Sequence, residues 1–271
     1  MNDGPPDPGS RELLASTRTQ EVHENVGELT PARVGIGRVG VSLPTAARLQ
    51  LRLDHARARD AVRHAFDADG VVGALTATGR EAIAVTSAAV SRDEYVRRPD
   101  LGRSLPVDAA SALRRPGVDR CDLAIVLCDG LSPGAIERYG PALVERITSN
   151  ERLGGWSIGP VAVVCNGRVA IGDAIGELLG ADIVVVLIGE RPGLTISESV
   201  GAYLTFGPRA GRTDADRNCI SNIHARGTDV DDAARRIVDL ASRARIAGAT
   251  GLTLTDDAPA PLAPRPPPPV R

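Results

Sequence analysis

Three runs of hydrophobic residues in the part of the chain after Pro116 predict buried strands. They lie at Leu123–Cys128, Pro160–Cys165 and Ile183–Ile188. The last run consists of six consecutive β-branched or leucine residues, which is typical of a central parallel strand covered on both faces. Polar turns separate the runs from segments with helical spacing. This alternation predicts an α/β fold with an open, Rossmann-like parallel sheet in three layers (α/β/α).

Apolar residues spaced three and four positions apart predict helices around these strands. Ser132 and Pro133 mark the start of one helix, as N-cap and first helical residue. Thr228 is expected to cap the last helix, and Gly180 and Gly248 to end the last two. The predicted helices cover Thr45–Phe66, the segment after Ser132, Asp173–Leu179 and Asp229–Ala247.

The chain is expected to consist of four parts. A flexible N-terminal tail at residues 1–30 precedes a small, mostly helical region at 31–115. The Rossmann-like domain follows at 116–257, and a Pro-rich disordered tail ends the chain at 258–271. Proline at this density favours an extended, solvated conformation over a packed element.

Composition excludes several classes of protein. The net charge is −2 and aromatic residues make up 2% of the chain, so the basic and stacking surfaces of a nucleic-acid binder are absent. There is no lysine, which excludes a P-loop lysine and a lysine Schiff base. The four cysteines are scattered, which favours a reducing cytosol over secretion. No apolar run reaches the ~20 residues of a membrane helix, so we expect a soluble cytosolic protein.

Two loops at the predicted carboxyl edge of the sheet are candidates for ligand binding. Gly189–Gly193 reads Gly-Glu-Arg-Pro-Gly, and its charged pair between glycines exceeds what a turn requires. Asp129–Ser132 lies at the equivalent edge, where turn and cap chemistry explain it equally well. Ser197-Glu198-Ser199 either adds polar contacts or caps a short helix.

Two other motifs have weaker interpretations. Gly35-x-Gly37-x-x-Gly40 matches the dinucleotide fingerprint by letter, but no strand precedes it and no helix opens on it, so we interpret it as a chance match. Asp216–His224 is dense in hydrogen-bonding side chains and is predicted to be a polar loop that holds a cofactor or contacts a subunit. A Cys219–His224 nucleophilic pair lacks an identifiable orienting group, and zinc would need more ligands.

Together these segments resemble the small (light) subunit of ethanolamine ammonia-lyase. The resemblance runs from about residue 33 to 255. Gly-Glu-Arg-Pro-Gly, followed some 25 residues later by Cys-Ile-Ser-Asn-Ile-His, is its most specific part. The other matching stretches are Arg97–Arg103, Asp129–Ser132, Gly167–Val169, Ile175–Ala181, Ser197–Ser199 and Asp216–Arg217.

The resemblance implies a subunit of an ammonia-lyase that depends on adenosylcobalamin. In that family the large subunit is a TIM barrel that binds ethanolamine and hosts the radical steps, and the cofactor lies between the subunits. The products are acetaldehyde and ammonia. No catalytic residue and no protein metal ligand is expected in this chain, and the 116–257 domain would bind cobalamin.

The family's cobalamin contacts map onto Val169, Glu190 and Cys219 of this sequence. We add Arg191, Ser197 and Ser199 as candidates from the neighbouring polar segments. The tails do not resemble those of enteric members, so encapsulation in a bacterial microcompartment stays open.

Cobalamin domains that place a histidine on cobalt use Asp-x-His-x-x-Gly, and this chain has no such motif. We therefore expect the cofactor to keep its own dimethylbenzimidazole as the lower ligand. Two alternatives remain: a stand-alone nucleotide-binding α/β enzyme, and a non-catalytic scaffold that has lost the cofactor. The first would need a phosphate-binding turn, which the sequence does not offer in the right context.

Overall fold

The computed structural model describes residues 36–114 and 120–254. The chain divides into two compact units, Met1–Asp60 with Pro192–Ser197, and Ala61–Arg191 with Glu198–Arg271. The two predicted tails lie outside the described residues, and the predicted domain limits at residues 31 and 116 stay predictions. The second unit holds the sheet and everything described below as the site.

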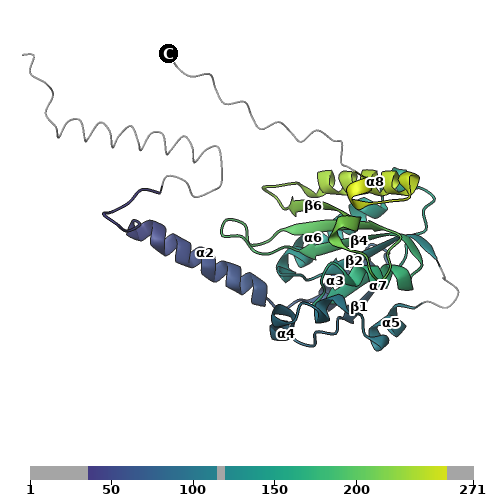
Figure 1. Ribbon diagram of the computed structural model, residues 1–271, viewed down its shortest axis with the longest axis horizontal. Helices are drawn as coiled ribbons and strands as arrows, with labels where there is room; N and C mark the ends of the chain where they lie inside the picture. Colours follow the sequence, from purple (N-terminus) through teal and green to yellow (C-terminus); the bar gives the residue numbers. More distant parts are fainter. Residues whose placement is uncertain (1–35, 115–119, 255–271) are drawn as a thin grey trace, which may run out of the picture. The chain divides into compact units, whose positions relative to one another are not determined.

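A six-stranded mixed sheet forms the centre of the second unit, in the order β1-β3-β2-β4-β5-β6 (Figure 1). The first four strands in this order are parallel, whereas β5 pairs antiparallel with β4 and β6 antiparallel with β5. The strands are β1 (Ala82–Thr86), β2 (Cys121–Cys128), β3 (Val161–Cys165), β4 (Ala181–Gly189), β5 (Val200–Phe206) and β6 (Arg217–Ile223).

Helices cover both faces of the parallel strands, and alternate residues of β2 show this directly. Leu123, Ile125 and Leu127 pack with α3 (Ala68–Ala77), α6 (Pro133–Thr148) and α8 (Val230–Ala247). Ala124, Val126 and Cys128 pack with α5 (Val107–Leu113) and α7 (Ile171–Leu178). A strand buried on both sides needs apolar residues at every position, which explains its continuous hydrophobic run. The predicted α/β fold in three layers is confirmed.

The antiparallel half of the sheet was not foreseen. Asp216–His224 was predicted to be a polar loop, and that prediction is wrong, because most of it is strand β6. The strand lies at the edge of the sheet and buries only Arg217, Ile220 and Ile223. An edge strand with one solvent-facing side carries polar residues, and its sequence therefore resembles that of a loop.

Helix ends agree with the sequence in part. Pro133 opens α6, and Gly248 ends α8 with a φ of 64°. The side chain that caps α8 belongs to Asp229 and not to Thr228, and Ser132 makes no side-chain cap bond to α6. The limits of α7 are shifted by one or two residues from those predicted.

The described part before the sheet is helical, as expected. It contains α2 (Thr45–Arg63), α3, α4 (Arg92–Arg97) and α5, with β1 among them. Gly40 lies inside a small turn closed by the bridge Val39–Ser42, and Gly37 precedes that turn, so this glycine motif is not a strand–helix phosphate loop. Four 3₁₀ turns complete the elements: η1 (Leu101–Arg103), η2 (Glu151–Leu153), η3 (Asp214–Asp216) and η4 (Gly251–Thr253). No helix among the described residues has the length and apolar character needed to cross a membrane.

Candidate functional site

A pocket of about 400 Å³ lies where the loops after β2, β3 and β4 meet. The carboxyl ends of parallel strands are the usual place for ligands in open α/β sheets. The pocket has apolar and charged residues in its lining, which consists of Tyr95, Gly130, Leu131, Arg168, Val169, Ile188, Gly189, Glu190, Arg191 and Tyr203.

Glu190 lines the pocket and is held by hydrogen bonds from Ser199, directly before β5, and from β6. Its backbone N–H donates to the Ser199 carbonyl at 2.9 Å, and its carboxylate accepts from the Ser199 hydroxyl. The backbone N–H of Asn222 also donates to the carboxylate, at 3.2 Å. A Cβ on Gly201 would lie 3.0 Å from Glu190 Oε1, so the glycine gives the carboxylate room. Among the described residues, no cationic side chain contributes to the orientation of the carboxylate.

His224 holds Asn222 in place, the β6 residue whose backbone N–H donates to Glu190. Asn222 has a φ of 65°, which asparagine tolerates better than most residues. The Asn222 Oδ1 lies 2.9 Å from His224 Nε2, and the N–H of Arg226 donates to His224 Nδ1 at 3.1 Å. Since Nδ1 accepts, the proton of the neutral ring is on Nε2, from where it bonds Asn222. Burial, and then the charge of Arg226, lowers the pKa of His224, which favours this neutral form.

Tyr203 and Cys219 face each other across β5 and β6 and share a side-chain hydrogen bond. Burial raises the pKa of both groups above their ordinary values, so Cys219 is a thiol at neutral pH. Cys219 does not itself line the pocket, but its partner Tyr203 does. Glu190, Ser199, Asn222 and Tyr203 are called the carboxylate side of the pocket below.

Tyr95 organises the opposite side. Its side chain is completely buried, and two guanidinium groups lie over its ring, that of Arg168 at 4.2 Å and that of Arg92 at 4.7 Å from the centroid. Arg92 also pairs with Asp129 at 3.1 Å. Arg168 donates from Nη2 to the carbonyl of Tyr95 at 3.2 Å. Tyr95, Arg92, Arg168 and Asp129 are called the arginine side.

Asp129 connects the loops of the arginine side. Its Oδ1 accepts the backbone N–H of Gly167 at 3.0 Å, while Oδ2 faces Arg92. Burial raises the pKa of Asp129 to about 6, although Arg92 and backbone N–H groups favour the charged form. Asp129 therefore holds the loop after β3 next to the loop after β2.

Two glycines allow these loops to touch the loop after β4. A Cβ on Gly189 would lie 2.2 Å from the Ser132 carbonyl oxygen and 2.5 Å from that of Asp129, and one on Gly130 would lie 2.1 Å from the Gly189 carbonyl oxygen. Leu131 N–H donates to the Gly189 carbonyl at 2.8 Å. These neighbours are backbone atoms that cannot rotate away, so both positions require glycine.

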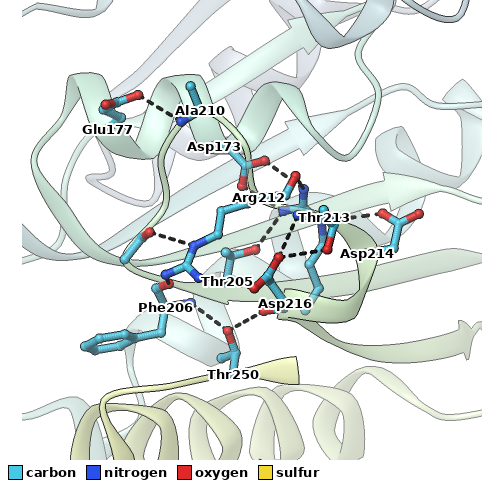
Figure 2. A network of polar contacts seen from close by, with 12 residues as sticks. Asp173, Glu177, Thr205, Phe206, Ala210, Arg212, Thr213, Asp214, Asp216 and Thr250 are labelled. Carbon is cyan, nitrogen blue, oxygen red and sulfur yellow. Dashed lines mark hydrogen bonds and ion pairs between the residues drawn. The ribbon is translucent and has the colours of Figure 1, made fainter. Parts of the chain in front are cut away.

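A polar network anchors the start of β6 (Figure 2). Arg217 is buried and makes two hydrogen bonds of 2.7 Å to the carboxylate of Asp173 on α7, and a third to Thr205 on β5. Arg212 adds bonds to the carbonyl of Phe206 and to Asp216. The bidentate pair joins α7 to β6 and so fixes the strand that carries Cys219.

The structure brings most of the predicted site residues together. Val169, Glu190 and Arg191 line one pocket, and Ser199 and Cys219 contact residues that line it. Ser197 belongs to the other unit, so its predicted role stays a prediction. Tyr95 and Tyr203 were missed, and Arg168 appeared only within a matching stretch. No periodic pattern points to them, because the fold alone gathers them. Within the described ranges, no group of three His, Cys, Asp or Glu residues is placed to hold a metal ion.

Comparisons with known proteins agree with one another. The family model for the ethanolamine ammonia-lyase light chain (EutC) matches residues 20–255. The chain is 45% identical over 250 residues to the ethanolamine ammonia-lyase small subunit of Xanthomonas campestris pv. campestris, covering 91% of this chain and 92% of the relative. It is 47% identical over 241 residues to that of Rhodopseudomonas palustris, covering 88% and 92%. For Bradyrhizobium diazoefficiens the identity is 48% over 232 residues, covering 84% and 88%.

Proposed function

Because this chain belongs to the family of ethanolamine ammonia-lyase small (light) subunits, we propose that its pocket holds one side of adenosylcobalamin against the large subunit. A small subunit of this carbon–nitrogen lyase implies a large partner. The observation that carries the proposal is the meeting of Val169, Glu190 and Arg191, three predicted cofactor contacts, in one pocket at the ligand-binding edge of the sheet.

The residues present fit part of such a cofactor. Cobalamin combines a wide apolar ring with peripheral amides and a phosphodiester, so it needs apolar surface and both donors and acceptors. Ile188 and Val169 supply apolar surface, Glu190 is an acceptor and Arg168 a donor. A pocket near 400 Å³ lies at the small end of the usual ~300–1,000 Å³ for drug-sized ligands, and cobalamin is larger. The pocket therefore serves as half of a site, and the partner closes the other half.

When bound, adenosylcobalamin supplies the radical that starts the conversion of ethanolamine to acetaldehyde and ammonia. The residues of this chain bind and orient the cofactor. Glu190, held by Ser199 and Asn222, presents its carboxylate to donor groups of the cofactor without having to move. Gly130 and Gly189 let the loops after β2 and β4 meet at the edge of the sheet that carries the pocket.

The identity of the lower ligand of cobalt depends on whether a histidine of this chain has a ring nitrogen available. His224 is the one closest in sequence to the predicted contacts, and both of its ring nitrogens are already used, by Asn222 and by the N–H of Arg226. We therefore propose that dimethylbenzimidazole stays on cobalt. Labelling the complex with ¹⁵N-histidine is expected to leave the superhyperfine pattern of cob(II)alamin unchanged in an EPR spectrum. A pattern altered by the label would contradict this.

All four cysteines are free, which supports a reducing compartment such as the cytosol. The Gly37–Gly40 turn gives no support to a stand-alone nucleotide-binding enzyme.

The decisive experiment is co-expression of this chain with its large subunit. We expect acetaldehyde release that depends on adenosylcobalamin, and none from either chain alone. Glu190→Gln should lower cobalamin affinity about tenfold, the size expected for one charge-assisted hydrogen bond. Glu145→Gln, at an exposed position of α6, is the matched control and should bind as the native complex does. Activity of this chain alone would instead favour a self-sufficient enzyme, and assembly without cobalamin binding would favour a scaffold.

A further inference from the structure

Arg168 lines the pocket with a positive charge that no carboxylate of the described residues neutralises. Its guanidinium lies 4.2 Å from the centre of the Tyr95 ring and donates from Nη2 to the Tyr95 carbonyl. Within residues 36–114 and 120–254 it forms no ion pair. Arg92, over the same ring, differs in this respect because it pairs with Asp129 at 3.1 Å. A half-buried guanidinium at a pocket, paired only with a carbonyl and a ring, has capacity left for an anion.

The side chain is held in place before any ligand binds. The backbone N–H of Arg168 donates to the Gly102 carbonyl at 2.8 Å. A Cβ on Gly102 would lie 2.7 Å from Cγ of Arg168 and 3.1 Å from Cδ2 of Tyr95. Glycine at 102 thus lets the arginine pass over the ring. This gives a physical role to the Arg-Pro-Asp-Leu-Gly-Arg stretch, which the proposed function does not use.

The other charges of the pocket leave Arg168 as the best anion ligand. Glu190 is negatively charged and is an acceptor held by Ser199 and Asn222, so it repels an anion. Arg191 is exposed, so water screens its charge. Arg92 is committed to Asp129. Among the described residues that line the pocket, only Arg168 combines partial burial with an unpaired charge.

We infer that Arg168 binds the phosphodiester of cobalamin, the one negatively charged group at the periphery of this cofactor. The inference rests on the proposed function and adds to it a specificity-determining residue, one that distinguishes complete cobalamin from analogues without the nucleotide loop. A planar, oriented guanidinium matches the paired oxygens of a phosphate better than an ammonium does. The alternative anion is a carboxylate of the large subunit, which would pair with Arg168 without any contribution to cofactor choice.

The test compares two analogues that differ only in phosphate, cobinamide and cobinamide phosphate, in equilibrium binding to the complex of both subunits followed by absorbance. We expect the native complex to prefer the phosphate form by about tenfold or more. Arg168→Gln should reduce this preference to within about twofold, while Arg168→Lys retains part of it. Arg103→Gln removes the same charge from an exposed neighbouring position and should keep the full preference.

Each other outcome overturns the inference in a distinguishable way. If Arg168→Gln weakens both analogues equally, its role is structural. If the variant impairs assembly of the subunits but keeps the preference, the anion is a carboxylate of the partner. If the native complex binds neither complete cobalamin nor the analogues, the proposed function itself fails. Thermal unfolding of each variant separates loss of the fold from loss of the phosphate contact.

Discussion

The carboxylate side and the arginine side of the pocket satisfy their charged groups differently. Glu190 accepts hydrogen bonds from Ser199 and Asn222, and no ion pair with a described residue contributes to its orientation. Arg168 lies over an aromatic ring and lacks a carboxylate partner in the part of the chain that the structure describes. The carboxylate of Glu190 is already oriented in the isolated chain and keeps lone pairs for further donors, whereas the charge of Arg168 is balanced only when an anion binds. The difference indicates a site built to receive a ligand with both donors and a negative charge.

The largest effect is expected where the two sides meet, at Gly189. Gly189→Val would place a side chain within 2.2 Å of the Ser132 carbonyl, so the loops after β2 and β4 would separate. We expect a loss of about 3 kcal/mol or more in the free energy of unfolding, together with loss of cobalamin binding. Chemical denaturation measures the first effect.

Gly73→Ala is the control for this change. Gly73 lies in α3, and a Cβ added to it would meet no atom within 4 Å, so alanine should stabilise the helix by about 0.5–1 kcal/mol. A Gly189→Val protein as stable as the native one would show that the close contact of the loops is unimportant.

Asp129 should make the arginine side sensitive to pH. Its pKa is raised to about 6 in the folded protein from an ordinary 3.8, so the folded state binds the proton more tightly than the unfolded state. Its contribution to stability is present below pH ~4 and is lost as the pH rises to ~6, by up to about 3 kcal/mol.

Urea unfolding of the native protein and of Asp129→Asn between pH 4 and 7 tests this. The variant leaves Arg92 without its carboxylate, which changes its free energy of unfolding at every pH. The difference in free energy of unfolding between the native protein and the variant should nevertheless change between pH 4 and 7. A constant difference would mean that Asp129 does not titrate there.

On the carboxylate side, Ser199→Ala removes one donor from Glu190. We expect a loss of about 1–2 kcal/mol in stability and a smaller loss of cobalamin affinity than for Glu190→Gln, because the N–H of Asn222 remains. Ser242→Ala, which removes a hydroxyl bonded to a helix carbonyl of α8, is the control and should change stability little. If both serine variants behave alike, the Ser199 hydroxyl does not stabilise the carboxylate.

The smallest effect is expected at His224. Its pKa is lowered in the folded protein from 6.5, so the stability it contributes is present above pH 6.5 and is lost as the pH falls through the folded value. Protonation would place a proton on Nδ1, where the N–H of Arg226 now donates. His224→Gln should flatten the decline of the free energy of unfolding toward acid pH, by less than the changes described above. An unchanged decline would contradict this.

The parallel half of the fold could be predicted from the sequence, and the antiparallel half could not. Strands β2, β3 and β4 are buried on both faces, and each of their ends lies within two residues of the end of the hydrophobic run that predicts it. Strand β6 exposes Ser221 and Asn222, and β5 includes Gly201 and Thr205, so neither has the pattern of a buried strand.

The site residues also fall into two groups, those that the sequence predicts and those that it does not. Glu190 and Val169 follow strands that the pattern predicts, and a loop at the end of a parallel strand is a natural place to look for a ligand. Tyr95 comes from a short helix that follows β1, and Tyr203 from the antiparallel β5. Their positions depend on tertiary packing, which no local pattern in the sequence records.

Hydrogen–deuterium exchange of the complex of both subunits, with and without adenosylcobalamin, tests most directly whether this pocket holds the cofactor. We expect cofactor-dependent protection of three segments, residues 167–170, 189–191 and 219–224, and no change in α8, which packs on the far side of β5 and β6 from Tyr203. Protection confined to the large subunit, with these three segments unchanged, would contradict the proposal that this chain forms half of the cobalamin site.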